Sequence, residues 1–363
     1  MLSDPQQKRG AVVRLTVAAL VASLAALVPG AASADTGLSW RTVPTGSEAQ
    51  FRGLAPVSGR IAWVSGTEGT VLRTSDGGRH WVDVSPGGDT TDLEFRDIEA
   101  WDARHAVIMS IGTGGDSRIY RTDDGGKSWR LGFKNREKDA FYDCVSFWDR
   151  RHGLAMSDPV DGKFRILVTK NGGRSWTKTD PAGMPAALDG EFGFAASGTC
   201  AVTAGKADAW IAGGGAAARV FHSTDRGETW SVVDTPIVRS EAGGIFSLAV
   251  RDRLNLVAVG GDFEKPDQSL HTSAYSRDGG ATWTEGGRLG GYRSGSSFLP
   301  RTGTGPSTGV IAVGPTGTDV SQDGGVTWLK VKRGAFDAVE CTADGACWAS
   351  GADGRVGVLL GLP

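Results

Sequence analysis

A motif of eight residues recurs six times along the chain and restricts its fold more than any other feature. Each copy has Ser or Thr first, Asp or Asn third, Gly fifth and Trp eighth. The copies span residues 74–81, 122–129, 169–176, 223–230, 276–283 and 321–328. Successive tryptophans lie about 45–54 residues apart. A fixed period of this length indicates a repeat architecture in which each repeat is one supersecondary unit.

The motif, called the box below, has the composition of a tight turn. Its third residue can accept backbone N–H bonds inside the turn, and its Gly can adopt positive φ without a Cβ clash. Its Trp begins the next strand and offers a large apolar face for packing between sheets. Because six equivalent copies favour structure over catalysis or calcium binding, we interpret these residues as structural: Asp76, Asp124, Asn171, Asp225, Asp278, Asp323, Trp81, Trp129, Trp176, Trp230, Trp283 and Trp328.

Each repeat also shows the same rhythm of short β-strands. In the first repeat, residues 51–57, 60–65, 70–74 and 81–84 have strand composition and are separated by turn residues. Four strands per repeat predict an all-β, seven-bladed β-propeller with four-stranded blades. The seventh blade lacks a box, and we expect residues 38–43 to supply its outer strand as an N-terminal clasp. Rings of six or eight blades are the alternatives.

The first 34 residues have the composition of a secretory signal peptide. Basic residues precede an apolar run over 15–28, and Ala32-Ser33-Ala34 fits a cleavage site. The run is shorter than the roughly 20 residues that span a bilayer, which disfavours a membrane anchor. We therefore expect an exported protein, extracellular or envelope-associated, whose residues 35–363 form one propeller domain with no membrane span after cleavage.

Charge and cysteine content narrow the function classes. The formal net charge is −2 and no basic cluster is present, which argues against nucleic acid as a partner. Cys341 and Cys347 flank a short turn and are expected to pair, whereas pairing of Cys144 with Cys200 stays open. The cysteines and the five scattered histidines lack metal-ligand spacing, so we expect no metal and no cofactor.

The first strand of each propeller blade lines the central channel, and its opening residues carry a second pattern. Phe-Arg pairs at 51–52 and 95–96, the Phe-Tyr pair at 141–142 and Tyr-Arg at 292–293 occupy matching places. Arg52, Arg96 and Arg293, with Tyr142 beside them, are therefore candidates for a carboxylate-binding cluster at one mouth. The alternative is that each Arg pairs with a nearby acid such as Asp97 or Asp143.

The six boxes resemble the bacterial-neuraminidase (BNR) repeat class of WD40/YVTN/BNR-like propellers, which includes sialidases. Box spacing, the stretch 62–74 and the clasp around Trp40 resemble the photosystem II stability and assembly factor family and its non-photosynthetic bacterial relatives. The resemblance implies an exported, non-catalytic scaffold that binds a partner protein, with an arginine patch for which Arg52, Arg96 and Arg293 are the candidates. We expect a protein or peptide partner and a monomeric scaffold.

Enzymatic alternatives have weaker support in the sequence. A carbohydrate-active propeller (a glycoside hydrolase, a sialidase-like enzyme or a lectin) would use acids of the loop face: Asp158, Asp161, Glu191, Glu241 and Asp262. The Arg-Ile-Pro motif of sialidases is absent, although a glycan ligand remains an alternative. An oxidoreductase label carried by some relatives lacks support, because the glycines at 213–215 lead into a strand rather than a helix.

Overall fold

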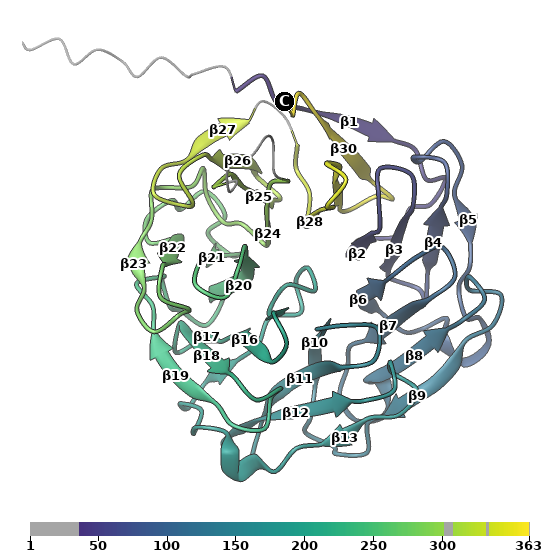
Figure 1. The fold of residues 1–363 in the computed structure, drawn as a ribbon, viewed down its shortest axis with the longest axis horizontal. Helices are drawn as coiled ribbons and strands as arrows, with labels where there is room; N and C mark the ends of the chain where they lie inside the picture. Colours follow the sequence, from purple (N-terminus) through teal and green to yellow (C-terminus); the bar gives the residue numbers. More distant parts are fainter. Residues whose placement is uncertain (1–35, 301–307, 332–333, 363) are drawn as a thin grey trace, which may run out of the picture. The chain divides into compact units, whose positions relative to one another are not determined.

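Seven antiparallel sheets are arranged radially about a central axis in the computed structural model, which describes residues 36–300, 308–331 and 334–362 (Figure 1). Six sheets have four strands and one has six. The predicted all-β propeller with seven blades is therefore confirmed, and the six- and eight-bladed alternatives are wrong. The predicted signal peptide, residues 1–34, lies outside the described residues.

In blades 1 to 4 and 6 the strands follow one another in chain order from the innermost to the outermost position. Blade 1 contains β2 (Phe51–Pro56), β3 (Ala62–Gly66), β4 (Val71–Thr74) and β5 (Val82–Asp83). Blade 2 contains β6 (Phe95–Ala100), β7 (Ala106–Ser110), β8 (Arg118–Thr122) and β9 (Arg130–Lys134). Blade 3 contains β10 (Tyr142–Phe147), β11 (Gly153–Val160), β12 (Lys163–Thr169) and β13 (Thr177–Lys178). Blade 4 contains β15 (Ala201–Ala204), β16 (Asp208–Ala212), β18 (Arg219–Ser223) and β19 (Ser231–Asp234).

Blades 5 to 7 complete the ring. Blade 5 contains β20 (Gly243–Val250), β21 (Leu256–Asp262), β22 (Ser273–Ser276) and β23 (Thr284–Glu285), and its inner side is extended by β17 (Gly214–Gly215) and β14 (Glu191–Phe192). Blade 6 contains β24 (Gly295–Phe298), β25 (Val310–Gly314), β26 (Gly317–Ser321) and β27 (Leu329–Val331). Blade 7 contains β28 (Ala338–Cys341), β29 (Cys347–Ser350), β30 (Val356–Leu360) and β1 (Ser39–Val43).

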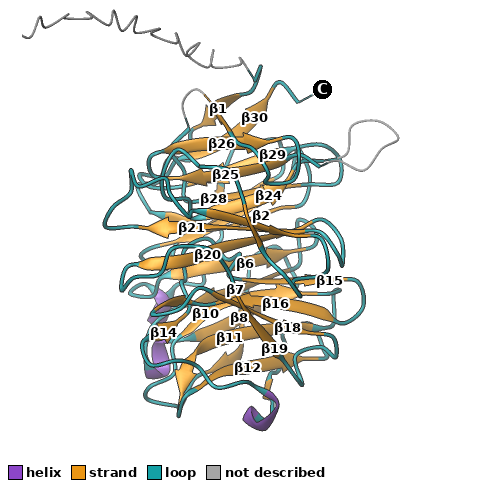
Figure 2. Ribbon diagram, turned by 90° about the vertical axis from the view of Figure 1, so that its left-hand side faces the viewer, coloured by secondary structure: helices purple, strands orange, loops and turns teal. Residues whose placement is uncertain are grey.

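Short helical turns interrupt this strand framework only in connections (Figure 2). They are the 3₁₀ turns η1 (Gly88–Thr90), η2 (Gly114–Asp116) and η3 (Pro181–Gly183). Within the described residues, no helix combines the length and the apolar character needed to cross a membrane.

The ring closes by pairing the two ends of the described chain. β1 runs antiparallel to β30, with Ser39 opposite Leu360 and Val43 opposite Val356. The predicted N-terminal clasp is thus present. Because β1 hydrogen-bonds to β30, the facing edges of both strands are paired and neither is left exposed.

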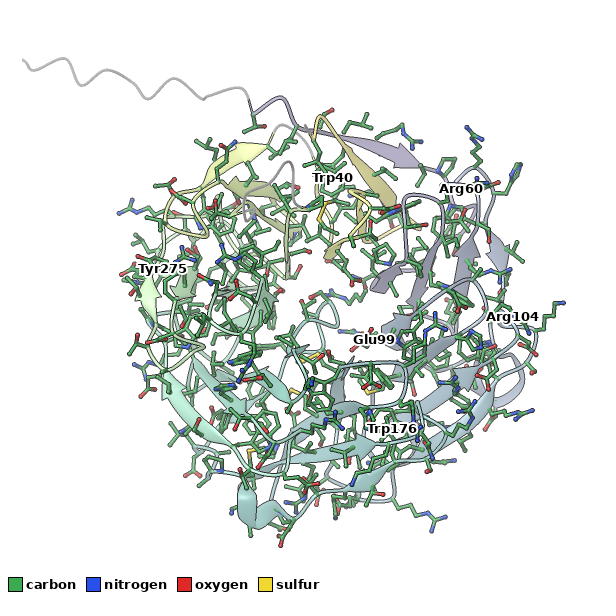
Figure 3. The ribbon with its side chains drawn as sticks, viewed as in Figure 1. Trp40, Arg60, Glu99, Arg104, Trp176 and Tyr275 are labelled. Atoms are coloured by element: carbon green, nitrogen blue, oxygen red, sulfur yellow. A yellow bond between two sulfur atoms is a disulfide. The ribbon has the colours of Figure 1, made fainter. Side chains whose placement is uncertain are left out.

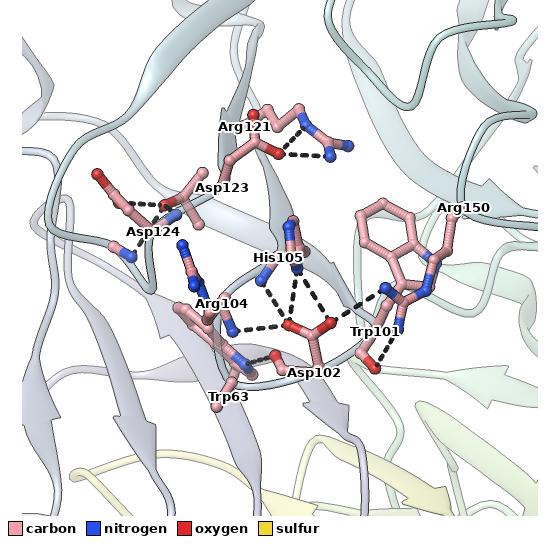
Figure 4. Close-up of polar contacts among 12 residues, drawn as sticks. Trp63, Trp101, Asp102, Arg104, His105, Arg121, Asp123, Asp124 and Arg150 are labelled. Atoms are coloured by element: carbon pink, nitrogen blue, oxygen red, sulfur yellow. Dashed lines mark hydrogen bonds and ion pairs between the residues drawn. The ribbon is translucent and has the colours of Figure 1, made fainter.

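The boxes occupy the turns between the third and fourth strands, as Figure 4 shows for Asp124 in blade 2. Asp124 Oδ1 accepts the Thr122 hydroxyl at 2.9 Å and the Ser128 N–H at 2.9 Å. The Gly126 N–H in turn donates to Thr122 Oγ1. The other five boxes repeat this network from Thr74, Thr169, Ser223, Ser276 and Ser321. Each box therefore satisfies its own backbone groups locally.

The box also fastens each blade to the one before it. Gly126 has φ +81°, and a Cβ placed there would lie 2.5 Å from Val84 Cβ. The Trp129 indole N–H donates to the Val84 carbonyl at 2.7 Å, and its ring packs edge-on against Trp63 at 6.3 Å. Gly126 thus combines a positive φ with a close interblade approach, and both require glycine.

Two disulfides add covalent ties. Cys341 is joined to Cys347 across the β28–β29 hairpin. Cys144 on β10 is joined to Cys200, directly before β15, and thereby links the inner strands of blades 3 and 4 across a sequence separation of 56. A loop of that size corresponds to about 4 kcal/mol of stabilisation in the chain-entropy description. The second pairing, which the sequence leaves open, is thus present.

Candidate binding site at the channel mouth

A β-bulge recurs where the innermost strands begin. The register between first and second strands shifts between Phe51 and Gly53 in blade 1 and between Phe95 and Asp97 in blade 2. Blades 3 and 5 have the same shift. A bulge inserts one unpaired residue and changes the direction of its side chain. The four inserted residues are Arg52, Arg96, Asp143 and Phe246.

Arg52, Arg96 and Phe246 line a cavity of about 430 Å³ at the mouth opposite the boxes, which we call the loop-face mouth. Arg52 Nη1 donates to the Ala196 carbonyl at 3.1 Å, and Arg96 Nη1 donates to the Ala195 carbonyl at 3.2 Å. The two arginine side chains are 21% and 28% exposed, and both line the cavity.

The two arginines differ in how many donors they retain. Arg96 forms an ion pair with Glu94, using Nε at 2.9 Å and Nη2 at 2.8 Å. Arg52 has only a distant acid partner, Asp337, at 3.9 Å. Its Nε is buried without a hydrogen-bond partner among the described residues. Arg52 therefore has spare donors for an incoming oxygen ligand. The alternative partner Asp97 is not involved, since its oxygens accept the Ile98 and Val145 N–H groups.

An aromatic wall faces the arginines. Phe194 stacks on Phe246 with centroids 3.8 Å apart, and Tyr292 packs edge-on against Phe246 at 4.7 Å. Phe263, from the loop after β21, contacts both stacked rings edge-on and is 48% exposed. The cavity thus joins a cationic side to an apolar aromatic side.

Two residues expected at this mouth lie elsewhere. Tyr142 is buried in the core between blades 2 and 3 and packs on Phe133 at 5.2 Å. It pairs with Ser157 across its blade just as Phe95 pairs with Ser110. Tyr142 therefore corresponds to the buried Phe95, and Asp143 is the bulge residue. The prediction for Tyr142 is wrong by one residue.

Arg293 is the second correction. It is fully buried, with Nε 2.7 Å from Asp319 Oδ2 and Nη1 2.8 Å from Thr316 Oγ1. Gly295 pairs with Val313 in the way that Gly53 pairs with Ser65, which places Arg293 in register with buried Phe51. Burial lowers the pKa of Arg293, although Asp319 opposes the shift. Arg293 therefore holds a loop together, and its neighbour Tyr292 reaches the cavity.

Asp143 and Asp158 form a buried acid pair behind the aromatic wall. Asp143 is 1% exposed, and its Oδ2 has no hydrogen-bond partner among the described residues. Asp158 Oδ1 accepts the Gly193 N–H at 2.7 Å. Burial and then the neighbouring Asp158 raise the pKa of Asp143 well above its ordinary value. Burial also raises the pKa of Asp158 to about 6.

The remaining loop-face acids do not converge on a reaction centre. Asp161 is exposed and pairs with Arg165 at 2.9 Å. Glu191 is buried against Arg219. Asp262 accepts the Ser240 hydroxyl at 2.8 Å and the Glu264 N–H at 3.0 Å, while Glu241 is exposed. None of these acids lines the loop-face cavity, so the paired carboxylates of a glycosidase are not assembled there.

The opposite mouth, on the side of the boxes, is acidic. Asp97, Glu99 and Glu340 line a cavity of about 350 Å³, and Figure 3 places Glu99 close to the central opening. Burial raises the pKa of Glu99 to about 8, and burial together with Glu99 raises that of Glu340 well above its ordinary value. Among the described residues, no group of three or more His, Cys, Asp and Glu side chains has the arrangement of a metal site.

Comparison with known proteins agrees with the class that this geometry defines, a β-propeller built from BNR/Asp-box repeats. The family model described as BNR/Asp-box repeat matches residues 221–232 and 274–285. No curated protein matches the sequence significantly.

The similar solved structures are propellers of low sequence identity. YCF48 bound to D1 peptide has 17% identity and a TM-score of 0.59, covering 88% of this chain and 96% of that one. YCF48 from Cyanidioschyzon merolae has 17% identity and a TM-score of 0.60, covering 88% and 98%. The WD40 propeller domain of Doa1 has 13% identity and a TM-score of 0.56, covering 88% and 96%. This chain therefore resembles these proteins in fold.

Proposed function

We propose that the protein is an exported, non-catalytic scaffold that binds an extended segment of a partner protein at the loop-face mouth. The observation that carries the proposal is the cavity in which Arg52 and Arg96 face the Phe194–Phe246 stack. A ligand that places a carboxylate on the arginines and an apolar side chain on the rings would use both halves. A peptide with an acidic residue or a free C-terminus beside an aromatic or aliphatic residue has this chemistry.

The arginines are suited to a carboxylate because of their remaining donors. Arg52 Nη2 lacks a partner among the described residues, whereas Nε is buried. A ligand carboxylate can accept from Nη2 while Nη1 keeps its hydrogen bond to the Ala196 carbonyl. Arg96 adds a second positive charge, and its partner Glu94 is 40% exposed and free to rotate into solvent when a ligand carboxylate arrives.

The aromatic wall provides the apolar contact. Phe263 is largely exposed at the rim, while Phe246 and Tyr292 are held in place by edge-on packing. Rigid aromatic surface of this kind gives contact area at small conformational cost on binding. A solved propeller of similar fold, YCF48, is described as bound to a D1 peptide, and this supports a peptide as the ligand class.

Export is supported by two separate features. The first 34 residues have the order of a secretory signal, with a basic region, an apolar run and a small-residue cleavage site. All four cysteines are paired in disulfides, which persist in oxidising compartments outside the cytoplasm. N-terminal sequencing of the secreted product should begin at Asp35, and a product retaining Met1 would contradict export by cleavage.

The ligand class is tested by selecting peptides from a random library on the secreted protein. We expect enriched sequences to join an acidic group or a free C-terminus to an aromatic or aliphatic residue. Amidation of that C-terminus, or Asp→Asn within the peptide, should then weaken binding at least about tenfold. Enrichment of basic sequences, or affinity that is indifferent to loss of the carboxylate, would contradict the proposal.

A further inference from the structure

A second cationic site lies on the opposite face, at the junction of blades 7 and 1. Arg41, Arg60 and Arg79 line one cavity of about 490 Å³. All three are exposed, and none has a side-chain hydrogen bond or ion pair with another described residue. We propose that this arginine trio is a binding site for a phosphate group carried by a ligand distinct from the peptide.

The three arginines come from different elements that meet at the clasp. Arg41 lies on β1, Arg60 lies in the turn between β2 and β3, and Arg79 lies in the first box. The supporting backbone is fixed, because the Gly77 N–H donates to the Arg60 carbonyl at 2.9 Å. The Gly59 N–H also donates to Asp344 Oδ2 at 3.0 Å. Because Arg41 lies on the clasp strand β1, the three arginines come together only when β1 is paired with β30.

The acid that shares the cavity does not neutralise it. Asp76 Oδ1 accepts the Thr74 hydroxyl and the His80 N–H, both at 3.0 Å, and Asp76 Oδ2 lies 2.6 Å from His80 Nδ1. Hydrogen bonds from the His80 backbone and then its side chain lower the pKa of Asp76. Because its oxygens are committed to the box, the three guanidinium groups remain free for an external anion.

The charge balance selects the class of anion. Three guanidinium charges exceed the two nearby carboxylates, that of Asp76 in the cavity and that of Asp344 bound to the Gly59 N–H, and leave an excess of positive charge. A phosphate monoester or pyrophosphate carries more than one negative charge and several acceptor oxygens, so it can engage more than one guanidinium fork at once. A monocarboxylate offers only two oxygens and one charge, and is the poorer match.

Blade 2 contains a natural control built on the same repeat. Arg104 corresponds to Arg60, because its carbonyl accepts the Gly125 N–H at 2.8 Å just as the Arg60 carbonyl accepts the Gly77 N–H. Lys127 occupies the position in its box that Arg79 occupies in the first box. Val82 corresponds to Arg41. Arg41 lies two residues before Val43, which packs on Gly78 of the first box, and Val82 lies two residues before Val84, which packs on Gly126 of the second box. Figure 3 shows the Arg104 side chain at the periphery of the ring, and Figure 4 shows it beside Asp102 and Trp63. This set has no counterpart of the exposed Arg41, and the Arg73 guanidinium that also reaches it already donates to the Ala103 carbonyl.

The proposal is tested by calorimetric titration of the secreted protein with inorganic phosphate and pyrophosphate at low ionic strength. We expect the wild type to bind pyrophosphate more tightly than phosphate. Arg60→Gln with Arg79→Gln should weaken pyrophosphate binding at least about tenfold. The matched pair Arg104→Gln with Lys127→Gln should change it less than about twofold. Thermal unfolding of both pairs should match the wild type, since all four side chains are exposed.

A vesicle arm separates the two sources of phosphate. Sedimentation with phosphatidylcholine vesicles that contain phosphatidic acid, whose headgroup is a phosphate monoester, should capture the wild type, and not the Arg60→Gln and Arg79→Gln protein, if the phosphate belongs to a lipid headgroup. Binding of pyrophosphate without vesicle capture would identify a soluble phosphate ligand. No pyrophosphate binding by the wild type, or equal weakening by both variant pairs, would overturn the proposal. Peptide binding at the other mouth is measured separately, so failure here leaves it intact.

Discussion

The two mouths of the central channel are built from the same seven strands and carry opposite chemistry. At the loop-face mouth, the first residues of the inner strands present Arg52, Arg96 and an aromatic wall. At the box-face mouth, the same strands present Asp97, Glu99 and Glu340 among serine and threonine hydroxyls. Each inner strand runs from the first mouth to the second, and on β6 Arg96 lies at the basic mouth while Glu99, three residues later, lies at the acidic one.

The two mouths differ in whether their ionisable side chains are charged and available to a ligand. The loop-face arginines are partly exposed and retain unused donors, so their charges are available to a ligand. The acids of the other mouth lie in surroundings that favour their neutral forms, since burial raises the pKa of Glu99 to about 8. One mouth is therefore arranged to attract an anion, while the other reduces its own charge. This contrast favours the loop face for the anionic ligand that we propose.

The strongest test is to reverse the charge of the basic mouth. Replacement of Arg52 and Arg96 by Glu should weaken binding of a selected acidic peptide at least about a hundredfold, because two attractive contacts become repulsive. The matched control, Glu99→Gln with Glu340→Gln at the other mouth, should leave affinity within about twofold. Fluorescence anisotropy with a labelled peptide measures both. Equal losses from the two double variants would mean that the mouths are not functionally distinct.

The charge state of the acidic mouth can be measured through stability. The folded-state pKa of Glu99 is about 8, above its ordinary value of 4.5, so the unfolded chain releases this proton first as pH rises. The stability of the wild type should therefore fall between about pH 5 and 8. Glu99→Gln should remove part of this loss and exceed the wild type by about 2 kcal/mol at alkaline pH, measured by denaturant unfolding.

A control for that experiment is Glu241→Gln, since Glu241 is exposed on the opposite face. This variant should follow the wild-type pH profile within a few tenths of a kcal/mol. If Glu99→Gln and the wild type lose stability in parallel across this range, Glu99 is ionised at neutral pH and the contrast between the mouths is smaller than we infer.

The sequence was sufficient for the fold because the box is a local structure. Thr122, Asp124 and Gly126 complete their network within seven residues, so the pattern alone predicts the turn. Spacing between boxes then fixes the blade size. The clasp was predictable because blade 7 lacked one strand that residues 38–43 could supply. The box and the blade size therefore follow from local sequence, whereas the clasp is a long-range pairing that the strand count revealed.

The site was predicted only in part because its register depends on the bulge. Phe-Arg at 95–96 and Phe-Tyr at 141–142 look equivalent in the sequence, yet pairing with the second strand aligns Tyr142 with Phe95. The same shift of one residue buries Arg293. Phe194 was missed for another reason: it lies in an insertion between blades 3 and 4 that has no counterpart in the other repeats. Only Arg52 and Arg96 lie where the pattern placed them.

The buried acid pair provides the finest test of the basic mouth. Asp158, with a pKa of about 6, loses its proton as pH rises toward neutrality, and the pair that it forms with Asp143 gains negative charge. Asp143 interacts electrostatically with Arg96. Asp158 accepts the N–H of Gly193, which directly precedes Phe194 of the aromatic wall. Affinity for an acidic peptide should therefore fall about threefold between pH 5 and 8, because added negative charge offsets part of the potential of Arg96.

Asp158→Asn isolates this effect. The amide keeps the shape of the side chain, its oxygen can still accept the Gly193 N–H, and it removes the group whose pKa is about 6. The variant should then bind the peptide with nearly constant affinity between about pH 5 and 8, because burial keeps the pKa of Asp143 well above its ordinary value. Peptides whose own carboxylates are ionised throughout this range keep the ligand from contributing. If the wild type and Asp158→Asn showed the same slope with pH, the acid pair would be a structural feature without influence on the mouth.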